Sequence, residues 1–141
     1  MEEKRDIFDL TFMFVLIFVV TGFIFAIPWF FISNQLVRIL GVDALRTSFD
    51  YIIFYGYYFF ETLVLALLVI KYSTDFYLKN AVIAEDQKPM LLRNVSILFL
   101  LFVLFPNILS IIVDPITSLI FLTSNFIVFS VIFLYFKQRV I

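Results

Sequence analysis

Four apolar stretches dominate the chain, and shorter segments that carry nearly all of its charges separate them. The stretches cover about residues 10–32, 51–70, 95–113 and 116–136. A transmembrane helix needs about 20 mainly apolar residues, because each residue advances the helix by about 1.5 Å. Each stretch is close to this length. The pattern therefore predicts an all-α integral membrane protein, a four-helix bundle that forms a single transmembrane domain over residues 1–141.

The connections between these stretches differ in length and composition. Only Asp114 and Pro115 separate the third stretch from the fourth, which predicts a tight antiparallel hairpin. The first connection opens with Ser33 or Asn34 as a helix cap and then mixes leucines with charged residues. We expect a short interfacial helix in this first loop.

Lys and Arg are distributed unevenly between the two ends of the predicted bundle. Only Arg38 and Arg46 lie in the first loop. The other eight lie at the end that holds both termini and the second loop: Lys4, Arg5, Lys71, Lys79, Lys88, Arg93, Lys137 and Arg139. Because cytoplasmic loops carry an excess of basic residues, both termini are expected to be cytoplasmic. The expected location is the plasma (cytoplasmic) membrane, which the chain crosses several times.

The composition excludes several kinds of chemistry. Hydrophobic residues make up 64% of the chain, well above the share in an ordinary soluble domain. There is no Cys and no His, which excludes disulfides, thiolate catalysis, haem ligation by His and the commonest transition-metal ligands. The net charge of −1 offers no broad basic surface to nucleic acid. We expect no metal site, no cofactor and no nucleic-acid partner.

One acid, Glu61, lies in the middle of the second apolar stretch. It is the eleventh residue of that stretch, and so lies about 15 Å from either end of the helix. An ionised carboxylate at this depth costs at least about 2.5 kcal/mol. Glu61 is therefore expected to face protein or water, or to carry a proton.

Polar residues at similar depth predict how this acid is satisfied. Thr21 lies near the middle of the first stretch and Asn125 near the middle of the fourth. Tyr57 and Tyr58 lie one turn before Glu61 on its own helix. We predict a polar midplane cluster of these five residues, whose hydrogen bonds hold the helices in register.

Four other aromatic residues are expected to anchor the helices at the two membrane interfaces. Trp29 lies late in the first stretch, and Tyr51 and Tyr55 lie at the start of the second, all toward the outer side. Tyr135 lies at the cytoplasmic end of the fourth. Trp and Tyr favour this region because their rings are amphipathic.

Two functions fit these features, and neither assigns a catalytic residue. Gly22 and Gly56 are the only glycines within the stretches, whereas carriers use small residues and broken helices at their moving contacts. This favours a non-catalytic accessory or structural subunit of a larger membrane complex, with the bilayer and other membrane subunits as partners. By analogy with other small helical subunits, this complex would be an energy-converting oxidoreductase, and its catalytic groups would lie on other subunits. The alternative is a small proton-coupled transporter or channel that uses Glu61.

Overall fold

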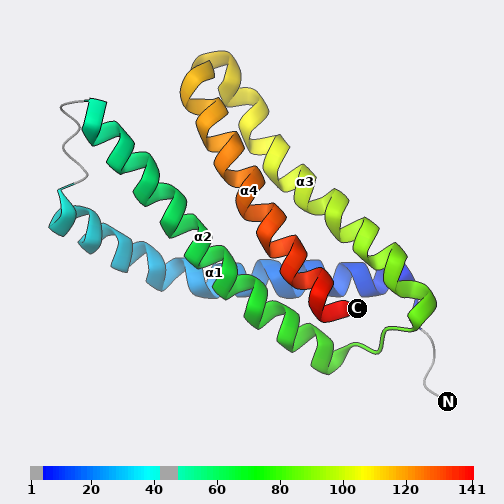
Figure 1. Ribbon diagram of the computed structural model, residues 1–141. Coiled ribbons are helices and arrows are strands. Elements are labelled where there is room, and N and C mark those ends of the chain that lie inside the picture. Colours follow the sequence, from blue (N-terminus) through cyan, green and yellow to red (C-terminus); the bar gives the residue numbers. More distant parts are fainter. Residues whose placement is uncertain (1–4, 42–47) are drawn as a thin grey trace.

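The computed structural model describes residues 5–41 and 48–141, and this part of the chain folds into four long helices. They are α1 (Ile7–Leu40), α2 (Ser48–Asn80), α3 (Lys88–Val113) and α4 (Pro115–Val140), with a single 3-10 turn η1 (Glu85–Gln87) before α3 (Figure 1). All four helices are long and apolar enough to cross a membrane. The predicted all-helical fold is therefore confirmed, and the four helices have the length and apolar character of a multi-pass membrane protein.

Local sequence signals determine where the helices end. Gly41 follows α1 with a φ of 67°, and its N–H bonds to the carbonyl of Val37. This left-handed conformation suits glycine, which has no Cβ to clash. Asp114 alone separates α3 from α4, and its carboxylate accepts a bond of 3.4 Å from the N–H of Thr117. The short turn expected between the last two helices is present, with Asp114 as its N-cap.

Helix α1 is longer than the first apolar stretch. It has 34 residues, which corresponds to about 51 Å, and it continues through Ser33 and Asn34 up to Leu40. Neither of these two residues caps the helix. The structure shows no separate interfacial helix, because residues 33–40 belong to α1 and residues 42–47 lie outside the described part of the chain.

The four helices pack tightly only at one end of the molecule. Figure 1 shows α3 and α4 side by side as a hairpin, while α1 lies across the other helices and separates from the hairpin toward its own C-terminus. The buried core lies where the start of α1 meets the end of α2, the start of α3 and the end of α4. Its residues are Leu10, Phe14, Ile70, Tyr77, Ala81, Leu91, Val95, Phe99, Ile132, Phe136 and Val140.

Phe14 lies at the centre of this core. Its ring centroid is 5.4 Å from that of Tyr77 on α2, 6.3 Å from that of Phe99 on α3 and 4.2 Å from that of Phe136 on α4. Tilted and edge-to-face aromatic pairs are favourable beyond the apolar area that they bury. This cluster therefore joins all four helices at the end where both chain termini lie.

The rest of α1 has no buried residue. From residue 19 to residue 40, every side chain is half-buried or exposed. The half-buried positions Thr21, Phe25, Trp29, Ser33 and Val37 recur every four residues, which places them on one face of the helix. The outer half of α1 therefore meets the rest of the chain along this single stripe.

Candidate functional site

Two polar contacts connect α1 with α2 along this stripe. The indole Nε1–H of Trp29 donates a hydrogen bond of 2.8 Å to Oε1 of Glu61. One turn further along α1, the hydroxyls of Ser33 and Tyr57 lie 3.5 Å apart. From the first pair to the second, the chain advances four residues on α1 and goes back four residues on α2. Antiparallel neighbouring helices are expected to have this arrangement. We call these four residues the α1–α2 polar ladder.

The Trp29 contact explains how the chain satisfies its membrane acid. A buried carboxyl group needs hydrogen-bond partners, and an indole N–H is a donor with no acceptor capacity of its own. Trp29 and Glu61 are each half-buried, and the indole ring adds apolar cover beside the carboxyl group. One carboxyl oxygen is thus satisfied, whereas within the described residues no hydrogen bond reaches the second.

The five residues of the predicted midplane cluster are only partly brought together. Tyr57 lies on the face of α2 that meets α1, beside Ser33. Tyr58 instead faces α4, where its ring centroid lies 4.6 Å from that of Phe121. Among the residues that the structure describes, no hydrogen bond joins Glu61 to Thr21 or Asn125.

Two features of the helices account for this arrangement. Because α1 continues to Leu40, its antiparallel register with α2 places Trp29 opposite Glu61. Thr21 lies eight residues earlier, about 12 Å along the helix. Asn125 lies on α4, which meets the face of α2 that carries Tyr55 and Tyr58 rather than the face that carries Glu61.

The four expected anchors have different surroundings. The hydroxyl of Tyr55 lies 3.3 Å from that of Thr117 on α4. Tyr51 is 48% exposed, while Tyr135 is half-buried against the core. Their placement at membrane interfaces stays a prediction. The Trp29–Glu61 pair was not foreseen, although Trp29 is the only Trp of the chain and its indole N–H is a donor without a charge.

A second set of polar contacts, also not foreseen from the sequence, ties the opposite end of the bundle together. The buried hydroxyl of Tyr77 donates to the carbonyl of Leu10 over 3.0 Å. Three more contacts act between distant segments: Asn94 Nδ2 to Thr11 Oγ1 at 3.2 Å, Gln87 Nε2 to the carbonyl of Arg5 at 2.7 Å, and Arg139 to Asp75 at 2.7 Å. These bonds hold Arg5, the start of α1 and the end of α4 against the rest of the bundle, which is a structural role.

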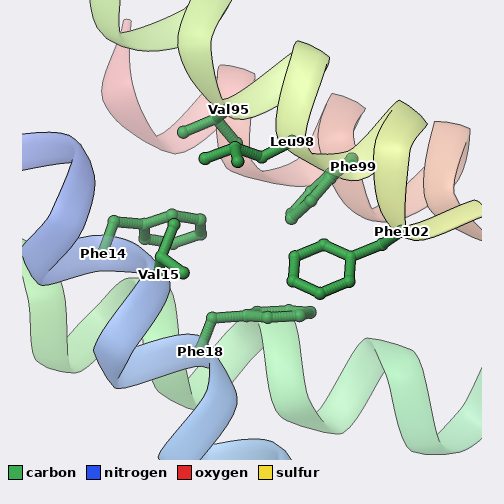
Figure 2. A pocket seen from close by; sticks show the side chains of 7 residues that line it. All are labelled: Phe14, Val15, Phe18, Val95, Leu98, Phe99 and Phe102. Atoms are coloured by element: carbon green, nitrogen blue, oxygen red, sulfur yellow. The ribbon is translucent and has the colours of Figure 1, made fainter. Parts of the chain in front are cut away.

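The gap between α1 and α3 is not a binding cavity. Figure 2 shows the side chains of Phe14, Val15 and Phe18 from α1 pointing toward Phe99 and Phe102 from α3. Their rings lie close together, with the centroids of Phe18 and Phe99 5.3 Å apart. The space that remains has no room for a water molecule. This cluster is part of the packing and not a ligand site.

The chemistry of the α1–α2 polar ladder is limited to a carboxyl group, an indole and two hydroxyls. A carboxyl group at this position can hold a hydrogen bond between helices or exchange a proton. Within residues 5–41 and 48–141, no three His, Cys, Asp or Glu side chains gather to hold a metal ion.

Comparison of the chain with protein families, with curated proteins and with solved structures finds no match.

Proposed function

We propose that this chain is a non-catalytic structural subunit of a larger integral membrane complex, in which another subunit covers the outer half of α1. One observation carries the proposal: Trp29 on α1 and Glu61 on α2 are only half-buried, where the outer half of α1 meets its own chain along one stripe. A polar pair left facing lipid is unfavourable, since hydrocarbon offers no hydrogen bonds. A neighbouring helix would complete its burial.

The apolar surface of α1 supports the same proposal. Beyond the core, this helix exposes large side chains such as Phe23, Ile27 and Phe30, each more than 60% exposed. Surfaces of this kind pack against lipid or against other membrane helices. Because this half of α1 lies beside the half-buried acid of α2, protein is a better neighbour than lipid for this side of the helix pair.

The distribution of charge supports an orientation for the proposed membrane protein. The end of the bundle that holds both termini and η1 carries most of the basic residues of the chain, and basic residues favour the cytoplasmic side. We therefore propose cytoplasmic termini and a multi-pass protein of the plasma membrane. The connection between α1 and α2 would then lie at the outer interface, where the first loop was expected to form an interfacial helix.

The test is the mass of the particle that contains the chain. Purified in mild detergent and measured by native mass spectrometry, the protein should carry defined heavier subunits. Phe30→Ala should lower the share of this complex, because Phe30 is 63% exposed on the outer half of α1. Phe12→Ala is the matched control, since Phe12 is 69% exposed on the inner half of the same helix. A lone monomer or small homo-oligomer in the wild type would refute the proposal.

A second candidate function is proton movement through Glu61. It is favoured by the carboxyl oxygen that, among the described residues, has no hydrogen-bond partner. In reconstituted vesicles, Glu61→Gln should then abolish proton flux, because an amide keeps the acceptor for Trp29 but does not titrate. Equal flux in the wild type and the variant would remove this candidate.

A further inference from the structure

A cavity of about 240 Å³ lies between α3 and α4. Its walls include Ser96, Leu100 and Val103 from α3 and Phe126, Ser130 and Phe133 from α4. It opens to the surface of the protein, because Leu100 is 44% exposed and Phe126 is 53% exposed. We call it the α3–α4 groove.

The lining of the α3–α4 groove suits an apolar ligand. Its two polar side chains, Ser96 and Ser130, donate to carbonyls of their own helices, over 2.9 Å to Arg93 and over 2.7 Å to Phe126. Neither hydroxyl is then left with a proton to donate to a ligand. The other lining residues are aliphatic or aromatic. A hydrocarbon chain fits this surface better than a polar molecule does.

Two basic residues continue the lining of the groove toward one end. Arg93 lies three residues before Ser96 on α3, and Lys137 lies four residues after Phe133 on α4. At these spacings each basic residue shares a helix face with a lining residue. Because α3 and α4 are antiparallel, both basic residues lie at the same end, the one that holds both termini (Figure 1).

These two cations differ from Arg139 and Lys88, two other basic residues at the same end of the bundle. Arg139 is paired with Asp75 at 2.7 Å, and Lys88 is paired with Glu85 at 2.6 Å. Arg93 and Lys137 are both exposed, and within the described part of the chain neither has a carboxylate partner. Positive charge therefore remains available where the apolar groove ends.

From this combination we infer that the α3–α4 groove binds an anionic phospholipid of the cytoplasmic leaflet. One acyl chain lies in the groove between the two helices, and Arg93 and Lys137 hold the phosphate. Basic residues at the cytoplasmic side of transmembrane helices attract anionic headgroups, and a guanidinium matches the geometry of a phosphate. The inference rests on the proposed cytoplasmic orientation of this end of the bundle, and not on the chain being a subunit of a complex.

The experiment is a lipid titration of the purified, delipidated protein, followed by native mass spectrometry. Phosphatidylglycerol and phosphatidylcholine with identical acyl chains are compared. Phosphatidylglycerol should bind at least about 10-fold more tightly, as expected for two basic residues near one anionic headgroup. The double variant Arg93→Gln with Lys137→Gln should remove this preference. Because both side chains are exposed, the variant should retain the helical structure of the wild type.

A matched control separates the groove from general attraction by charge. Lys71→Gln with Lys79→Gln removes the same charge from α2, also from exposed positions, and should leave the preference intact. Ser130→Phe places a ring in the groove and should weaken binding of both lipids. Equal loss in the two double variants, equal affinity for both lipids in the wild type, or no effect of Ser130→Phe would overturn the inference. So would a tightly held helix of another subunit in the groove.

Discussion

The contact between Trp29 and Glu61 predicts a measurable coupling between α1 and α2. The perturbation is a double-mutant cycle of Trp29→Phe, Glu61→Leu and the combined variant. Trp29→Phe removes the N–H donor and keeps an aromatic ring, while Glu61→Leu removes the acceptor and keeps a side chain of similar size. The cycle therefore isolates the free energy of the pair from the loss of packing at each site.

The expected magnitude follows from the geometry of the bond. Hydrogen bonds between membrane helices contribute about 0.6 kcal/mol on average and up to about 1.7 kcal/mol. The bond between Nε1 and Oε1 is short, at 2.8 Å, which favours a value above this average. Since both side chains are only half-buried, we expect a coupling of about 1 kcal/mol.

The assay is equilibrium unfolding in mixed micelles, followed by far-UV circular dichroism. Trp29 is the only Trp of the chain, so the emission of Glu61→Leu reports directly on the lost contact and should shift relative to the wild type. A control cycle pairs Trp29→Phe with Asn125→Leu and should show no coupling. Additive effects in the first cycle would refute the contact, and coupling in the control would show that the cycle does not isolate the pair of Trp29 and Glu61.

Three further predictions concern contacts outside the α1–α2 polar ladder. Tyr77→Phe removes a buried hydroxyl that bonds to a carbonyl of α1 at 3.0 Å, and should lower the free energy of unfolding by about 1 kcal/mol. Arg139→Gln removes an ion pair with Asp75 whose side chains are 50% and 33% exposed. Its effect should stay below about 1 kcal/mol and shrink with added salt, as measured by unfolding at low and high ionic strength. Asp114→Ala removes the N-cap of α4, and the long bond of 3.4 Å predicts a loss of about 0.5 kcal/mol in the same unfolding assay.

Each of these three has a result that would contradict it. An unchanged stability of Tyr77→Phe would mean that the bond between the Tyr77 hydroxyl and the Leu10 carbonyl makes no net contribution to the free energy of unfolding. A salt-independent effect at Arg139 would indicate packing of its aliphatic stem instead of an ion pair. A neutral result for Asp114→Ala, beside a destabilised Asp114→Gly, would show that the turn depends on backbone conformation and not on the cap.

The fold class could be predicted because it depends on the hydropathy of consecutive residues and on backbone hydrogen bonds within each helix. The apolar stretches are close to the thickness of a bilayer, and within hydrocarbon a helix satisfies its own backbone. The short turn at Asp114 and Pro115 could also be predicted, because Asp is favoured as the N-cap of a helix and Pro at its first position. The end of α1 was harder to predict. Ser33 resembles a cap but its hydroxyl lies beside Tyr57, and the helix ends only at Gly41.

The partners of Glu61 show why a candidate site is harder to predict than a span. Counting residues from the ends of the apolar stretches placed Thr21 at the depth of Glu61. The continuation of α1 to Leu40 shifts the register so that Trp29 lies there instead. The helix also directs Tyr57 toward α1 and Tyr58 toward α4. An error of a few residues at a helix end is therefore enough to change every contact across the interface.

The sequence by itself determined four long apolar helices, the tight last turn, and the presence of one acid that needs a partner inside the membrane. These follow from hydropathy and backbone chemistry, which act locally. The tertiary structure alone decided that Trp29 is that partner, that Tyr77 and Phe14 join the ends of the helices, and that α3 and α4 leave a groove open. Those features depend on the register, crossing and rotation of whole helices, which no local pattern specifies.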